Sequence, residues 1–122
     1  MSTFRGTTPV LRSFDEAKAR EFYIDFLGFE VAGEHRFQPG SPLYLILVRD
    51  GTELHVSEHF GDATPGAHVR IEVEGVTAYV RGLRAKAYRH AAPGDPEATP
   101  WETLEATITD PAGNRLTFWE RG

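Results

Sequence analysis

The chain has 122 residues, of which 13 are basic and 18 acidic, so its net charge at neutral pH is −5. A chain of this length forms one domain with a real core, and 40 % apolar residues without a long apolar run exclude a disordered or membrane-spanning protein. The absence of cysteine excludes disulfides and thiolate chemistry, and the acidic balance argues against nucleic acid as a partner. The N-terminus lacks the basic-then-apolar order of a signal peptide, so we expect a cytoplasmic protein.

The first half of the sequence predicts one helix among four strands. Ser13-Phe14-Asp15-Glu16 fits a capping box, which starts a helix, and Gly28 stands where such a helix ends. Apolar residues recur at helical spacing between them. Asp50-Gly51 predicts a type I′ hairpin turn, because both central residues of that turn need a positive φ. The expected elements are a strand at 8–12, a helix at 14–27 and strands at 29–34, 43–48 and 53–57.

The second half predicts the same order with weaker signals. Residues 68–73 alternate polar and apolar as a half-buried strand does, and an amphipathic helix follows from Val76 to Leu83. Asp110-Pro111-Ala112-Gly113 predicts a turn between strands at 103–109 and 114–119. The stretch Ala91–Pro100, rich in alanine, proline and acid, is predicted to be a surface loop that closes over the site.

The two halves align as a repeat. Thr8–Asp15 matches His68–Gly75 at an offset of 60 (68 − 8), and Gly51–Val56 matches Gly113–Phe118 at an offset of 62 (113 − 51). The sequence therefore predicts an α+β fold of two βαβββ modules within a single domain, 1–122. We place the modules at about 7–58 and 67–120, joined by a linker at about 59–66.

Strand alternation divides the side chains into a face under the helices and an opposite, more polar face. Hairpin pairing extends the second face, because residues directly opposite across an antiparallel pair point to the same side. Aromatic rings, histidines and carboxylates mixed on one concave face are typical of a small-molecule pocket. The candidate ligand-binding residues are Tyr44, Ile46, His55, Ser57, His68, Glu72, Trp101, Glu105, Thr117 and Trp119.

Two signatures resemble the vicinal-oxygen-chelate superfamily, which includes glyoxalase and bleomycin-resistance proteins. They are Phe22-Tyr23-x-Asp25-Phe26-Leu27-Gly28-Phe29 and Asp110-Pro111-Ala112-Gly113-Asn114, and the resemblance runs from about Thr7 to Trp119. Pro100-Trp101 is similar to the bleomycin-resistance group, with Glu102 in place of that group's usual glycine. The resemblance implies two modules that form a curled mixed sheet around a concave ligand cleft, and pairing of modules across the subunits of a homodimer.

The resemblance also implies where a family metal would bind. The family's ligand positions hold Thr8, His55, His68 and Thr117, whereas family enzymes normally present His, Gln or Glu at three or four of them. A hydroxyl is a poor ligand beside an imidazole or carboxylate, so we expect no metal and no other cofactor. Glu53 or Glu105 would have to reach inward to complete a site.

The predicted function is binding and sequestration of a bleomycin-like small molecule without chemistry. Trp101 and Trp119 favour an aromatic ligand, and Glu72 and Glu105 favour a cationic one. The alternative is a metal-dependent lyase, isomerase or dioxygenase that uses His55, His68 and a carboxylate. A third possibility is an enzyme fold retained as a ligand-binding partner of another protein.

Overall fold

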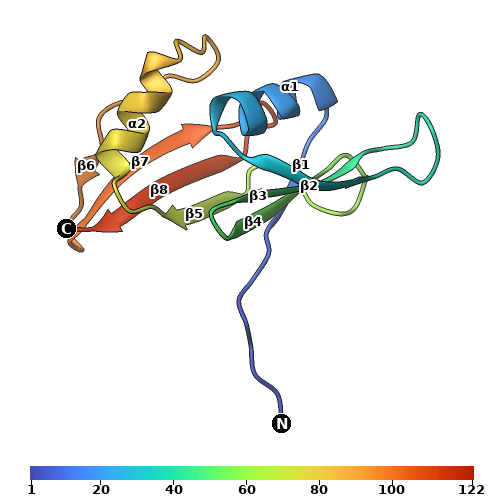
Figure 1. Ribbon diagram of the computed structural model, residues 1–122, viewed down its shortest axis with the longest axis horizontal. Coiled ribbons are helices and arrows are strands. Elements are labelled where there is room, and N and C mark those ends of the chain that lie inside the picture. The colour runs from blue at the N-terminus through green and yellow to red at the C-terminus, as the bar shows by residue number, and fades with distance from the viewer.

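Two four-stranded sheets form the framework of the protein. The computed structural model describes residues 1–122. The first sheet has the order β1-β4-β3-β2 and contains β1 (Val10–Arg12), β2 (Glu30–His35), β3 (Tyr44–Arg49) and β4 (Thr52–Ser57). The second has the order β5-β8-β7-β6 and contains β5 (His68–Glu72), β6 (Glu97–Ala98), β7 (Thr103–Thr109) and β8 (Arg115–Arg121). Figure 1 shows both helices on one side of these sheets, and the predicted α+β fold is confirmed.

The two sheets repeat one pairing pattern. In each, the first strand runs parallel to the last, and the remaining neighbours are antiparallel. Val10 lies beside His55 in the first sheet, and Arg70 lies beside Thr117 in the second. These pairs are related by the predicted offsets, 70 − 10 = 60 and 117 − 55 = 62. The repeat inferred from the sequence is therefore present in the strand register.

The first helix begins later than its capping signal suggests. It consists of α1 (Glu16–Arg20) and a π-helical turn, η1 (Glu21–Phe26), and it is capped by Asp15, whose carboxylate accepts the Lys18 backbone N–H at 3.0 Å. The prediction of Ser13 as the capping residue was wrong. The Ser13 backbone N–H donates to the Ser57 carbonyl at 2.8 Å, which draws this residue into the pairing of β1 with β4.

The predicted loop 91–100 contains a short strand that the sequence does not reveal. In β6, Glu97 pairs with Glu105 and Ala98 with Leu104 of β7. Two residues are too few to show a period of two, so only the neighbouring strand defines this element. The helix α2 (Val76–Ala85) forms as expected. Neither helix has the length and apolar character of a membrane-spanning segment.

The helices cover one face of the sheets and leave the other open. Leu54, Val56, Leu116 and Phe118 are buried on the helix side, as the alternation predicts. The Phe118 ring packs edge-on against Tyr79 of α2, with centroids 5.1 Å apart. Polar residues of β4 and β8 alternate with these positions and therefore point to the uncovered side.

A buried polar junction joins the modules. Asp110, in the turn between β7 and β8, accepts the Tyr23 hydroxyl at 2.6 Å and the side-chain and backbone N–H groups of Asn114 at 2.9 and 2.8 Å. The Ala112 backbone N–H donates to the same carboxylate at 2.9 Å. Asn114 also donates to the carbonyl of Arg12 in β1. Burial raises the pKa of Tyr23 well above its usual value, and the Asp110 charge adds to this, so the hydroxyl remains a donor.

Candidate functional site

The candidate site is the face of the two sheets opposite the helices. The strand register agrees with hairpin pairing about the two turns: Tyr44 lies opposite Ser57, Ile46 opposite His55, Thr107 opposite Thr117 and Glu105 opposite Trp119. The candidate residues fall into two groups on this face. The first sheet carries Tyr44, Ile46, His55 and Ser57, and the second carries His68, Glu72, Glu105, Thr117 and Trp119, with Trp101 in the turn before β7.

His55 is the centre of the first group. Its Nε2 lies 2.8 Å from the Glu53 carboxylate, and its Nδ1 lies 2.6 Å from the Tyr44 hydroxyl. A carboxylate only accepts, so in the neutral imidazole Nε2–H donates to Glu53 and Nδ1 accepts from Tyr44. Burial raises the pKa of Tyr44, and the Asp62 and Glu53 charges raise it further. Both nitrogens of His55 are therefore occupied.

Ser57 faces the same side but is fully buried. Its hydroxyl donates to the Asp62 carboxylate at 2.6 Å and accepts the His59 backbone N–H at 3.1 Å. These contacts hold the start of the β4–β5 connection, so Ser57 anchors a loop.

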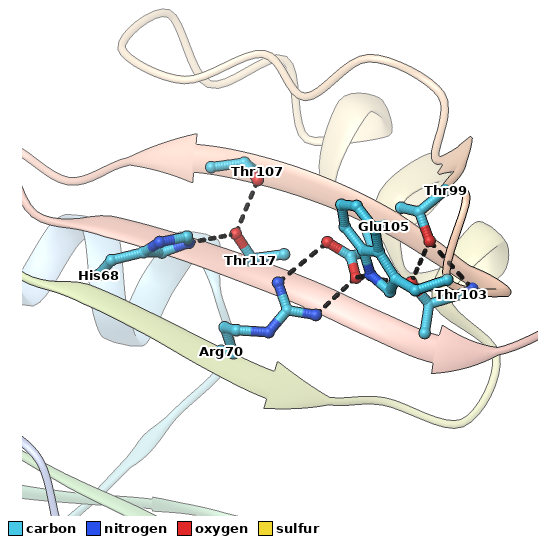
Figure 2. A network of polar contacts seen from close by, with 8 residues as sticks. His68, Arg70, Thr99, Thr103, Glu105, Thr107 and Thr117 are labelled. Atoms are coloured by element: carbon cyan, nitrogen blue, oxygen red, sulfur yellow. Dashed lines mark hydrogen bonds and ion pairs between the residues drawn. The ribbon is translucent and has the colours of Figure 1, made fainter.

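In the second group, a chain of hydrogen bonds crosses three strands, as Figure 2 shows. His68 Nε2 on β5 lies 2.7 Å from the hydroxyl of Thr117 on β8, which lies 2.7 Å from the hydroxyl of Thr107 on β7. Thr117, the middle member, is buried, whereas His68 and Thr107 at the two ends are exposed. The two ends of this hydrogen-bonded series are therefore accessible from the uncovered face.

Glu105 has the densest set of partners on the face (Figure 2). Its carboxylate accepts two hydrogen bonds from the Arg70 guanidinium, at 3.0 and 2.5 Å, and one from the Thr103 hydroxyl at 2.6 Å. The Trp101 indole N–H donates to it at 3.0 Å. Arg70, followed by Thr103, lowers the pKa of Glu105 to about 2, so the carboxylate is ionised at any ordinary pH. The negative charge predicted at Glu105 is present, but Arg70 already neutralises it.

The two tryptophans differ in their environment. Trp101 lies in the turn before β7 and is 62 % exposed, although its N–H is tied to Glu105. Trp119 is half-buried on β8, with the guanidinium carbons of Arg70 and Arg121 at 5.7 and 5.5 Å from its ring centroid. Neither ring lies under the helices, so both remain candidates for stacking.

The face is open rather than enclosed. A cavity of about 710 Å³ lies between β5 and the segment that precedes β1, and His68 and Glu72 line it. Glu72 also lines a cavity of about 700 Å³ near α2, with Arg49 and Tyr79. The other eight candidate residues line neither of these two cavities.

The family's metal positions do not form a metal site. Thr8 is exposed ahead of β1, and Thr117 is buried and bonded to His68. His55 would have to give up Tyr44 or Glu53 to coordinate an ion. No group of three or more His, Asp or Glu side chains is placed to hold a metal. The donor set does not fit a catalytic ion, and the absence of a metal stays a prediction.

Arg70 is a residue of the uncovered face that is not among the candidate ligand-binding residues. Alternation gives its side, and nothing in the sequence gives its partner, because Arg70 lies on β5 and Glu105 on β7, with β8 between them. A cation on the predicted ligand face was the signal available.

Fold and site together define a two-module protein with an open, aromatic and charged face. A family model described as "Glyoxalase superfamily protein" matches residues 2–122, and the chain therefore belongs to the glyoxalase superfamily. The resemblance to the vicinal-oxygen-chelate superfamily is thereby confirmed. Among curated proteins, none matches this chain.

Several solved structures are similar over nearly their whole length. TnmS3, an antibiotic binding protein from Streptomyces sp. CB03234, is 25 % identical with a TM-score of 0.79, covering 100 % of this chain and 99 % of its own. A bleomycin-binding protein complexed with bleomycin is 21 % identical with a TM-score of 0.71, covering 98 % of this chain and 100 % of its own. A glyoxalase/bleomycin resistance protein/dioxygenase superfamily member from Sphaerobacter thermophilus DSM 20745 is 20 % identical with a TM-score of 0.74, covering 98 % of both chains. The last two establish likeness of fold alone.

Proposed function

We propose that this protein binds and sequesters a small aromatic cation of the bleomycin type on the uncovered face of its sheets, without converting it. The observation that carries the proposal is an ionised carboxylate with two indole rings beside it, at Glu105, Trp101 and Trp119. Aromatic faces attract cations, and a carboxylate of low pKa keeps its charge. The antibiotic-binding description of TnmS3 and the bleomycin complex of a second similar structure support the ligand class.

Bleomycin is expected to quench the tryptophan fluorescence of the protein, and Trp101→Ala to weaken its binding about tenfold, or about 1.4 kcal/mol. The loss follows from removal of an exposed ring beside Glu105, and the fold is little affected because the ring is 62 % exposed. Calorimetric titration gives the affinity. Phe37→Ala, which removes an exposed ring from the β2–β3 loop, is the matched control and leaves the affinity unchanged. Equal affinities of Trp101→Ala and the parent protein would contradict the proposed site.

We also propose that the protein forms a homodimer. The segment before β1 extends away from the sheets (Figure 1), and Phe4 on it and Phe60 on the β4–β5 connection are almost fully exposed. These exposed rings are available for contact with a second copy of the chain, and most soluble oligomers are symmetric dimers. We expect a dimer by light scattering at micromolar concentration. A monomer that still binds its ligand with full affinity would argue against this assembly.

A further inference from the structure

Arg70 lies across the face proposed to bind the ligand. Its strand, β5, is separated from β7 by β8, and its register partner on β8 is Thr117. To reach Glu105 the side chain spans two strand spacings, on the order of 9–10 Å. Figure 2 shows the guanidinium pointing from β5 over β8 to the Glu105 carboxylate. The surface beneath this side chain is covered by the protein itself.

The remaining partners of Glu105 come from its own part of the chain. Thr103 is two residues away on β7, and Trp101 lies in the turn just before it. This turn is closed by hydrogen bonds between Thr99 and Thr103, which involve both backbone and side chains. The carboxylate is therefore held in place without Arg70.

Solvent access also distinguishes the two members of the ion pair. The Arg70 side chain is 42 % exposed, whereas that of Glu105 is 12 % exposed. A half-exposed arginine swings into water at small cost, while a covered carboxylate left without a cation loses a strong partner. Arg70 is thus the exchangeable member.

We propose that Arg70 occupies the place of a ligand's planar cation, so that a guanidinium or amidinium carried on an aromatic group binds by displacing Arg70 from Glu105. This inference rests on the proposed function of the same face. Two parallel N–H···O bonds hold the pair, and a planar fork replaces both, whereas an ammonium acts as a point charge. A group in this place meets the Trp119 ring, since the Arg70 guanidinium lies 5.7 Å from its centroid.

The consequence has an unusual sign. Removing a residue that contacts a ligand weakens binding. Removing a residue that competes with the ligand for the same partner strengthens binding. Every planar cation must break the Arg70–Glu105 pair before it binds. Its apparent affinity is therefore the affinity for free Glu105 multiplied by the fraction of molecules in which Glu105 is free. Removing Arg70 is expected to raise this fraction to one and so to raise the apparent affinity.

The test uses benzamidine and benzylamine, two aromatic cations of similar size, titrated by NMR into the parent protein, Arg70→Met and Glu105→Gln. Arg70→Met is expected to bind benzamidine about tenfold more tightly than the parent, and to bind benzamidine more tightly than benzylamine. Glu105→Gln is expected to lose the preference for benzamidine over benzylamine. Arg115→Met is the matched control, because it removes an equal charge from an exposed position of β8 on the same face of the sheet. We expect its affinity for benzamidine to change less than twofold.

Arg70→Lys provides a second variant, which keeps the charge and loses the fork, and its affinity for benzamidine is expected to lie between those of the parent and Arg70→Met. The inference would be overturned if both Arg70 variants bound benzamidine no more tightly than the parent, with unchanged melting temperatures. So would a gain no larger than that of Arg115→Met. Failure of bleomycin to bind the parent, with the benzamidine pattern intact, would refute the proposed function and leave this cation site standing.

Discussion

Replacing Asp110 by alanine is expected to lower the free energy of unfolding by about 3–5 kcal/mol. The carboxylate accepts hydrogen bonds from Tyr23, Asn114 and the Ala112 backbone, and all of these are at or near the interior. A buried donor that loses its acceptor costs about 1–3 kcal/mol, and the alanine leaves several such donors at once. Urea unfolding followed by circular dichroism measures the change.

Asp95→Ala is the matched control for this substitution. Asp95 pairs with Arg84 at 2.5 Å, but its side chain is 70 % exposed, so we expect a much smaller change than at Asp110. Tyr23→Phe removes a single donor from the Asp110 cluster and is expected to cost about 1–2 kcal/mol. If Asp110→Ala were no more destabilising than Asp95→Ala, the junction between the modules would not be a source of stability.

Gly28→Ala is expected to destabilise the protein by about 2–3 kcal/mol. Gly28 ends the first helix with φ +87°, a left-handed conformation that costs an alanine about 1–2 kcal/mol. A Cβ at this position would also overlap the Arg49 guanidinium. That group donates to the Leu27 carbonyl at 2.9 Å, and moving it away forfeits this hydrogen bond.

A second glycine separates the two contributions. Gly75 has φ +83°, and a Cβ there meets nothing within 4 Å, so Gly75→Ala measures backbone strain alone, about 1–2 kcal/mol. In an Arg49→Ala background the cost of Gly28→Ala is expected to fall to that of Gly75→Ala. Equal costs at the two glycines in the parent background would show that Arg49 contributes nothing, as measured by thermal unfolding of all four variants.

The two family signatures therefore act on the fold rather than on the ligand. Tyr23 and Gly28 belong to the first signature, and Asp110 and Asn114 to the second. Tyr23 and Asp110 meet in one buried cluster, and Gly28 makes room for Arg49. The proposed ligand-binding face lies on the other side of the sheets, so membership of the superfamily fixes the framework and leaves that face free to differ.

The sequence by itself determined the features that depend on neighbours in the chain. Alternation with a period of two assigned Trp119 to the uncovered face and Phe118 to the core, because successive strand residues point to opposite sides. Asp50-Gly51 set the register that places Ile46 beside His55, because a two-residue turn fixes which residues face each other. These interactions act over a few residues, and the residue types report them directly.

Only the tertiary structure decided which distant groups meet. Ser13 is diverted from its capping role by Ser57, β6 exists because β7 lies beside it, and Tyr23 reaches Asp110 across 87 positions of the sequence. Arg70 bonds to Glu105 because a long side chain on one strand reaches past its neighbour to the next. Periodicity gives the face of a side chain but not its reach or its partner, and the charge that a ligand meets depends on both.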